Sequence, residues 1–123
     1  MKKRLILVAV VLLLILVGCG TVSGSKTTAQ KVSCDNMKDL LSNYDSFLID
    51  VREASEYEEG HLENAINISS TKISSITTYD NITKDSVIVV YCATGKRSGD
   101  SAKKLVELGY KKVFDLGSIN NCK

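Results

Sequence analysis

A cysteine at the end of an apolar run is the residue of this chain that points most clearly to chemistry. Residues 87–91 favour a buried strand, and Cys92 follows them directly. The next residues include Gly95 and Arg97, and a helical pattern begins at Ser98. Loop amides and the start of a helix stabilise negative charge, so we expect the pKa of the Cys92 thiol to lie below its usual value of about 8.5.

This arrangement allows two interpretations of Cys92. A thiolate is a nucleophile at physiological pH, whereas a neutral buried cysteine is a small apolar core residue. Gly95 and Arg97 favour the interpretation of Cys92 as a nucleophile, because a cysteine that only fills the core does not require a glycine and a cation in the loop that follows. The candidate active-site loop is Ala93, Thr94, Gly95, Lys96, Arg97 and Ser98. Its backbone N–H groups can surround the sulfur, and Gly95 permits the curl since glycine adopts positive φ without strain.

Composition narrows the class of protein. The chain has 123 residues, enough for one small domain, and a formal charge of only +2. Three of its cations lie within the first four residues, so the remainder is nearly neutral and offers no basic surface for nucleic acid. The four cysteines are Cys19, Cys34, Cys92 and Cys122. They form no C-x-x-C pair and there is a single histidine, so we expect no metal and no cofactor.

The N-terminus has the features of a targeting signal. Basic residues precede an uncharged apolar run at residues 5–17, which is shorter than the ~20 residues that span a bilayer. The run ends Leu16-Val17-Gly18-Cys19, which resembles the lipobox of bacterial lipoproteins, where the cysteine is acylated after cleavage. The resemblance implies a signal peptide at 1–18 and a lipid on Cys19, at the extracytoplasmic face of a bacterial membrane. Residues 20–30 are small and polar without apolar periodicity, so we expect a lipidated flexible tether at 19–30 and a domain at 31–123. The alternatives are an ordinary anchor helix and an uncleaved signal in which the cysteine is incidental.

Strand and helix patterns alternate through the rest of the chain. The expected strands are residues 31–32, 47–49, 65–68, 87–91 and 113–114. The expected helices are one near Met37 to Leu41 capped by Ser33 or Asp35, then residues 53–59, 69–77 and 98–108, the last with Gly109 as its C-cap. Such alternation predicts a small parallel α/β sheet with helices on both faces, whose ligands bind beyond the carboxyl ends of the strands. Cys92 and Asp50 both lie at such ends.

Four segments, taken in order, resemble the rhodanese-like domain. They are Asp50-Val51-Arg52 after a strand, the segment from Glu56-Tyr57 to Gly60-His61-Leu62-Glu63-Asn64-Ala65-Ile66-Asn67-Ile68, the strand and loop Val89-Val90-Tyr91-Cys92 with Gly95 and Arg97-Ser98, and the closing Gly109-Tyr110 and Val113 to Gly117. The resemblance covers roughly residues 32–119. Asn64 stands where the family usually has glycine, and the tryptophan often found after the last glycine turn is missing.

The resemblance implies that the protein moves sulfane sulfur. Cys92 would take sulfur from a donor such as thiosulfate, hold it as a persulfide and pass it to a thiophilic acceptor, with the protein acting as a monomer. A carrier module with little turnover is one alternative. Phosphatase or arsenate reductase chemistry is another, but related phosphatases place one residue more between their cysteine and arginine than the four found here. The shorter loop suits a single sulfur atom.

The resemblance also suggests roles for residues around the loop. We expect Lys96 either to attract an anionic donor or to be a solvated surface charge. Arg97 is expected to turn inward and pair with a carboxylate, either Asp50 or Glu56, because its planar fork suits bidentate pairing. Two further residues complete the set: Arg52, expected to be structural, and His61, expected to hydrogen-bond a loop rather than to act as a base.

Cys34 and Cys122 remain once Cys19 and Cys92 have roles. The first and last strands lie close together in this family, so the resemblance implies that a disulfide could join the ends of the domain, and an extracytoplasmic location would permit it. Two independent thiols, or one thiol that resolves the persulfide, are the alternatives that the spacing leaves open.

Overall fold

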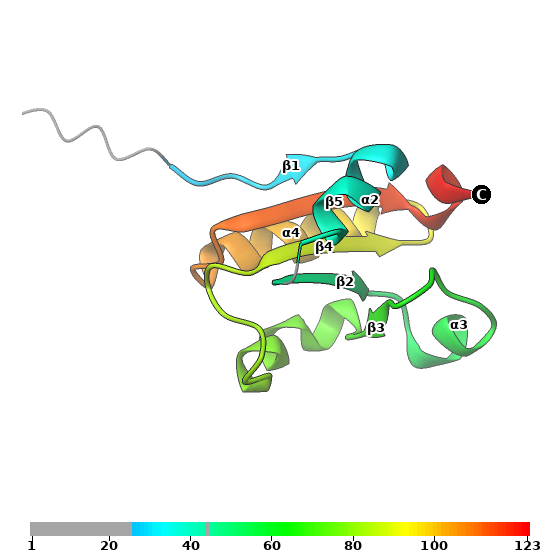
Figure 1. The fold of residues 1–123 in the computed structure, drawn as a ribbon. Helices are drawn as coiled ribbons and strands as arrows, with labels where there is room; N and C mark the ends of the chain where they lie inside the picture. Colours follow the sequence, from blue (N-terminus) through cyan, green and yellow to red (C-terminus); the bar gives the residue numbers. More distant parts are fainter. Residues whose placement is uncertain (1–25, 44) are drawn as a thin grey trace, which may run out of the picture.

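Five parallel strands form the central sheet, in the order β1-β5-β4-β2-β3 (Figure 1). The computed structural model describes residues 26–43 and 45–123. The strands are β1 (Gln30–Lys31), β2 (Ser46–Asp50), β3 (Ile66–Asn67), β4 (Val87–Cys92) and β5 (Lys112–Ser118). The helices are α2 (Cys34–Leu41), α3 (Ala54–Glu58) and α4 (Lys96–Glu107), with 3₁₀ helices η1 (Ser70–Thr78) and η2 (Ile119–Cys122). The parallel sheet with helices around it confirms the predicted α/β fold class.

Most of the predictions for the N-terminus concern residues outside the described ranges 26–43 and 45–123. The predicted signal peptide at 1–18, the lipidated Cys19 and the tether as far as residue 25 lie outside the described residues. Residues 26–29 have no regular structure, and β1 begins at Gln30. Within the part of the chain that the structure describes, no helix is both long and apolar enough to cross a membrane.

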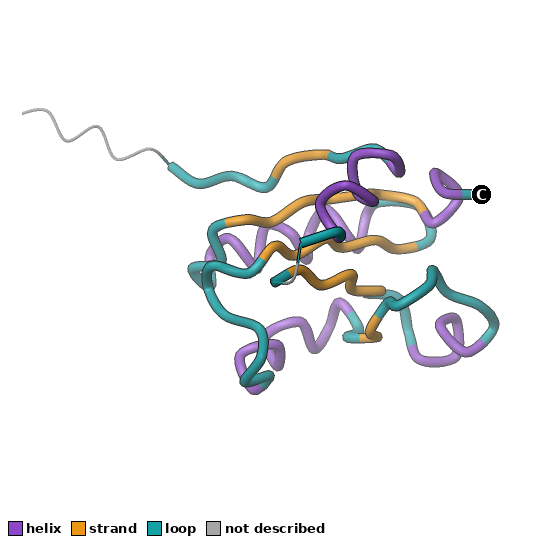
Figure 2. The backbone as a smooth tube through the Cα atoms, in the orientation of Figure 1, coloured by secondary structure: helices purple, strands orange, loops and turns teal. Residues whose placement is uncertain are grey.

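Strand β4 is the centre of the core, and all six of its residues are buried. Its side chains alternate between the two faces of the sheet. Ile88, Val90 and Cys92 belong to the core cluster beneath α4 and η1, whereas Val89 and Tyr91 belong to the cluster beneath α2 and η2. Figure 2 shows these helical segments on either side of the strands. The sheet is therefore covered on both faces, which explains the continuous apolar run that predicted this strand.

Helix α4 starts two residues earlier than the apolar pattern predicts. Gly95, with φ of 99°, precedes the helix in the left-handed conformation, and the chain is helical from Lys96. The pattern pointed to Ser98 because it detects apolar periodicity, and the residues before that position are polar. As a result, Arg97 and Ser98 lie in the first turn, where the N–H groups have no partner within the helix.

Other boundaries differ from the prediction for local reasons. The segment expected to be a helix at 69–77 is the 3₁₀ helix η1, whose buried residues are Ile73 and Ile76. The last strand is longer than expected and runs on into η2, which the pattern did not predict. The register shifts opposite Val90 and Tyr91, so that β5 has one extra residue there. Asn64 has φ of 65°, and asparagine tolerates the conformation for which the family usually uses glycine.

Candidate active site

The Cys92 sulfur lies at the carboxyl end of β4, inside the loop that follows it. The backbone N–H of Gly95 donates to Sγ at 3.0 Å and the backbone N–H of Ser98 donates at 3.3 Å. The first donor comes from the residue that turns the chain, and the second comes from the first turn of α4. The early start of this helix therefore aims one of its free N–H groups at the sulfur.

These donors change the acidity of the thiol. Burial raises the pKa of the Cys92 thiol, because the charged form loses solvation. The backbone N–H groups of Ser98, Gly95 and Thr94 and the nearby Ser98 hydroxyl act in the opposite direction and outweigh burial. The Ser98 hydroxyl donates its own proton to the carbonyl oxygen of Gly95 at 3.1 Å. The net pKa is lower than that of an ordinary cysteine, so the site favours a thiolate.

The sulfur lies beneath the loop rather than at the surface. Cys92 is 0% exposed, whereas Thr94 and Lys96 in the loop above it are exposed. A reactant must therefore displace part of this cover before it can touch Sγ. The loop also lies against Gly117, because a Cβ added to Gly95 would make an ordinary van der Waals contact with Gly117 Cα at 3.6 Å.

Arg97 pairs with Glu56. Its Nη1 and Nη2 donate to the two carboxylate oxygens at 2.6 and 2.9 Å, which is a bidentate arrangement. The hydrogen bond from Arg97, aided by the backbone N–H of Glu53, lowers the pKa of Glu56 to about 2. Of the two carboxylates that the sequence offered as partners, the structure selects Glu56. The pair connects the start of α4 to α3.

Asp50 has a different partner, which is also an arginine. Its carboxylate is completely buried and accepts hydrogen bonds from Arg52 Nε and Nη2, the latter at 2.7 Å. Arg52 Nη2 also donates to the carbonyl oxygen of Gly60 at 2.7 Å. The Asn67 side chain donates to the backbone carbonyls of both Asp50 and Arg52. These residues hold the segment between β2 and α3 in place, so that Glu56 faces Arg97.

His61 contacts α3. Its Nδ1 is 2.9 Å from the carbonyl oxygen of Tyr57, and its ring stacks on the Tyr57 ring with centroids 3.7 Å apart. Among the described residues, no hydrogen bond connects His61 to the loop around Cys92. Lys96 is exposed beside the loop, as both of its predicted roles require.

Ser118 supports the loop but was not predicted to do so. Its hydroxyl donates to the carbonyl oxygen of Ala93 at 2.6 Å, from the strand next to β4. The sequence held one signal that could have identified it. Ser118 follows Gly117 at the end of the last apolar segment, and parallel strands end at the same edge of a sheet.

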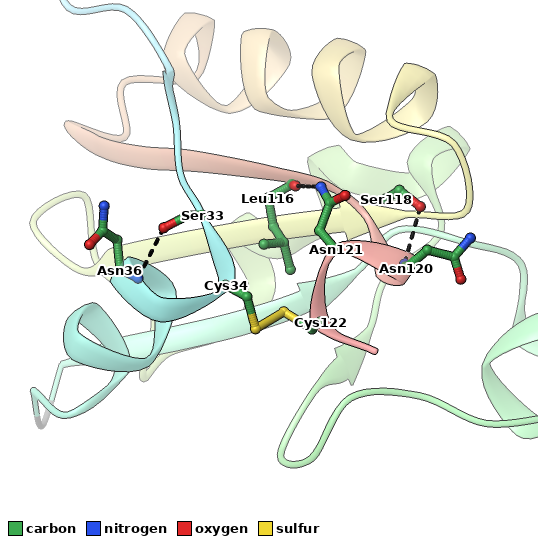
Figure 3. The surroundings of a disulfide bond; sticks show 8 residues. All are labelled: Ser33, Cys34, Asn36, Leu116, Ser118, Asn120, Asn121 and Cys122. Atoms are coloured by element: carbon green, nitrogen blue, oxygen red, sulfur yellow. Dashed lines mark hydrogen bonds between the residues drawn. A yellow bond between two sulfur atoms is a disulfide. The ribbon is translucent and has the colours of Figure 1, made fainter.

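Cys34 and Cys122 form a disulfide between the start of α2 and η2 (Figure 3). Both residues pack against the core cluster on the α2 face of the sheet, whereas Cys92 belongs to the cluster on the α4 face. Cys92 is the free cysteine of the described residues. The disulfide is therefore separated from the reactive sulfur by the sheet.

Comparisons with known proteins agree with this geometry. The profile of the Rhodanese-like domain family matches residues 33–122. Thiosulfate sulfurtransferase GlpE of Coxiella burnetii is 35% identical over 78 residues, covering 63% of this chain and 71% of that protein. Thiosulfate sulfurtransferase PspE of Escherichia coli is 32% identical over 73 residues, covering 59% and 70%. The solved structure of a rhodanese with anions from E. coli superposes with a TM-score of 0.58 at 32% identity, covering 62% of this chain and 89% of that one.

Proposed function

The chain belongs to the rhodanese-like family and is a rhodanese-type sulfurtransferase, and from this premise we propose that Cys92 carries the transferred sulfur as a persulfide. The Cys92 thiolate attacks the outer sulfur of a donor such as thiosulfate. A bond forms between the two sulfurs, the bond within the donor breaks, and sulfite leaves with the electron pair. A thiophilic acceptor then attacks the outer sulfur, and Cys92 leaves as the thiolate.

One observation carries this proposal: two backbone N–H groups point at Cys92 Sγ, from Gly95 at 3.0 Å and from Ser98 at 3.3 Å. They stabilise the thiolate that attacks and again the thiolate that leaves. The turn at Gly95 and the first turn of α4 hold both donors beside the sulfur before a reactant arrives. A single sulfur atom attached to Sγ adds little bulk to this small enclosure.

The surrounding residues hold the loop and attract the donor. In this proposal Arg97 and Glu56 brace the start of α4, while Asp50 and Arg52 position the segment that carries Glu56. Lys96 is exposed at the loop and has no salt-bridge partner among the described residues, which leaves its charge free to attract an anionic donor.

The test is cyanolysis of thiosulfate, measured as thiocyanate formed, by the wild-type protein and by Cys92→Ser. We expect turnover by the wild type and none by the variant, while Thr77→Ala, on the surface of η1, retains full activity. Mass spectrometry of the wild type after exposure to thiosulfate is expected to show one added sulfur on Cys92. Equal rates for the wild type and Cys92→Ser would contradict the proposal. A persulfide that forms without turnover would indicate a carrier module, and hydrolysis of an aryl phosphate would indicate a phosphatase.

We further propose that residues 1–18 are a lipoprotein signal peptide and that a lipid on Cys19 holds the domain at the extracytoplasmic face of a membrane. The direction of the chain is compatible with this arrangement. Residues 26–29 approach β1 from the amino ends of the parallel strands, whereas Cys92 lies at the carboxyl end of β4 (Figure 1). An anchor on that side leaves the active-site loop accessible. We expect the wild type in the membrane fraction with acyl chains on Cys19 by mass spectrometry; Cys19→Ala that stays acylated or keeps the same processed N-terminus would contradict the proposal.

A further inference from the structure

The peptide group between Ala93 and Thr94, at the start of the active-site loop, has a partner for each of its polar atoms. The Ser118 hydroxyl donates to the carbonyl oxygen of Ala93 at 2.6 Å. The N–H of the same peptide belongs to Thr94, and it is one of the groups that lower the pKa of the Cys92 thiol. The C=O and N–H of a trans peptide point in opposite directions. The Ser118 hydroxyl and the Cys92 sulfur therefore lie on opposite sides of one rigid unit.

The direction of the Ser118 hydroxyl is set by its own neighbours. The backbone N–H of Asn120 donates to Ser118 Oγ at 3.1 Å (Figure 3). A carbonyl oxygen can only accept a hydrogen bond, so the hydroxyl proton points at Ala93. Gly117, the residue before Ser118, is also held, because its N–H donates to the Asp115 carboxylate at 2.8 Å. Ser118 is thus anchored through the residues before and after it.

The extra residue in β5 is what places a hydroxyl beside the loop. Val90 is opposite Asp115, whereas Cys92, two residues after Val90, is opposite Ser118, three residues after Asp115. In a regular register the residue opposite Cys92 would be Gly117, which has no side chain. Bulges are frequent next to active sites, where they redirect a side chain. Here the bulge supplies the loop with a donor that a regular strand would lack.

We propose that Ser118 is a positioning residue for sulfur transfer: its hydroxyl orients the peptide between Ala93 and Thr94 so that the N–H of this peptide faces the reacting sulfur. The Thr94 N–H is then a third donor beside those of Gly95 and Ser98. A hydrogen bond accepted by the carbonyl oxygen also polarises the N–H of the same peptide, which strengthens it as a donor.

The inference rests on the proposed persulfide chemistry and gives Ser118 a part in it. Cys92 is a thiolate both when it attacks the donor and when it leaves after the acceptor has taken the sulfur. A hydrogen-bond donor that is oriented in advance stabilises the negative charge on the sulfur in both steps. Ser118 acts through the peptide rather than on the reactants.

Amide NMR of the full chain tests the orientation of this peptide without requiring turnover. As the pH is raised through the pKa of Cys92, we expect the Thr94 amide signal of the wild type to shift, because its N–H faces the sulfur that becomes charged. Cys92→Ser is expected to show no such shift. In Ser118→Ala the shift of Thr94 is expected to be largely lost, whereas the Gly95 and Ser98 amides still respond. Ser118→Thr keeps the hydroxyl and is expected to restore the shift.

Kinetics test the consequence for the reaction. Ser118→Ala is expected to raise the midpoint of alkylation rate against pH and to lower kcat for cyanolysis about tenfold, since one donor is misoriented rather than removed. The KM for thiosulfate is expected to stay nearly unchanged, because Lys96 remains exposed. Ser46→Ala is the matched control. The Ser46 hydroxyl donates to the carbonyl oxygen of Asn43, also at 2.6 Å, but at the amino end of β2. This variant is expected to keep the wild-type midpoint and kcat.

The inference is overturned if the Thr94 amide of the wild type does not respond to ionisation of Cys92, or if folded Ser118→Ala keeps the wild-type midpoint and kcat. Equal losses of kcat in Ser118→Ala and Ser46→Ala also overturn it, because they would reflect reduced stability alone. A wild type that turns over no thiosulfate contradicts the proposed function instead, and the amide titration still decides the orientation of the peptide.

Discussion

Replacement of both disulfide cysteines by serine, Cys34→Ser with Cys122→Ser, is expected to remove a large part of the stability of the domain. The two cysteines are 88 residues apart, so the bond restricts nearly the whole domain in its unfolded state. The chain-entropy relation gives a stabilisation of about 4.5 kcal/mol for a loop of this size. Since domains typically unfold at a cost of about 5–15 kcal/mol, the loss is a substantial fraction of the total.

The assay is urea unfolding of the full chain, with the parent and the double variant followed under identical conditions. A dithiol reductant added to the parent is expected to produce the same loss, whereas it leaves the double variant unchanged. The comparison removes any effect of the serine side chains. A loss below about 1 kcal/mol would refute the argument, because the unfolded state would then be restricted by something other than the disulfide.

The same variant tests how far the disulfide influences the active-site loop. Cys122 lies in η2, which starts next to Ser118, and the Ser118 hydroxyl donates to the carbonyl oxygen of Ala93 at 2.6 Å. Ser118 itself belongs to β5, which is held by pairing with β4 and not by the disulfide. We therefore expect the pH profile of thiol alkylation to be unchanged in the folded double variant, even though its stability is reduced.

Three further predictions concern the loop and its brace. Gly95→Ala is expected to destabilise the protein by about 1–2 kcal/mol and to reduce sulfur transfer, since φ at this position is 99°. The control is Gly99→Ala in α4, where the added Cβ meets only an ordinary contact, so this variant is expected to be neutral or stabilised by up to about 1 kcal/mol. Urea unfolding that ranks the stabilities of the two variants in the opposite order would contradict this. Ser98→Ala is expected to raise the pKa of the active-site thiol, measured as the midpoint of alkylation rate against pH, and an unchanged midpoint would show that the hydroxyl is unimportant. Glu56→Gln removes the bidentate partner of Arg97 and is expected to cost about 1 kcal/mol at neutral pH. The pKa of Glu56 is lowered to about 2 in the folded protein, whereas it is about 4.3 in the unfolded chain. The pair with Arg97 therefore contributes its full stabilisation above about pH 4.3 and loses it as the pH falls toward 2. Unfolding curves across this range should show that loss of stability in the parent but not in the glutamine variant.

The order of strands and helices and the position of the reactive cysteine were predictable from the sequence because they depend on neighbouring residues. The apolar run before Cys92 identifies a strand buried on both faces, and Ser33 caps α2 as its side chain predicts. The glycine after Cys92 indicates a turn, and the structure places φ of Gly95 at 99°. In each case the physical cause lies within a few residues of its effect.

The boundaries were less predictable where polar residues adopt regular structure. Helix α4 begins at Lys96 because Gly95 turns the chain there, although no apolar residue marks the first turn. The same two-residue difference decides which N–H groups face the sulfur, so a small error in the boundary changes the description of the site.

The sequence by itself determined the parallel α/β order, the loop after β4 and the presence of a cysteine at its start. Only the tertiary structure decided that Arg97 pairs with Glu56 rather than with Asp50, that Ser118 supports Ala93, and that the disulfide lies on the opposite face of the sheet from Cys92. These contacts join residues far apart in the chain. They depend on the order and register of the strands, which bring the carboxyl ends of β2, β4 and β5 to one edge and which no local pattern encodes.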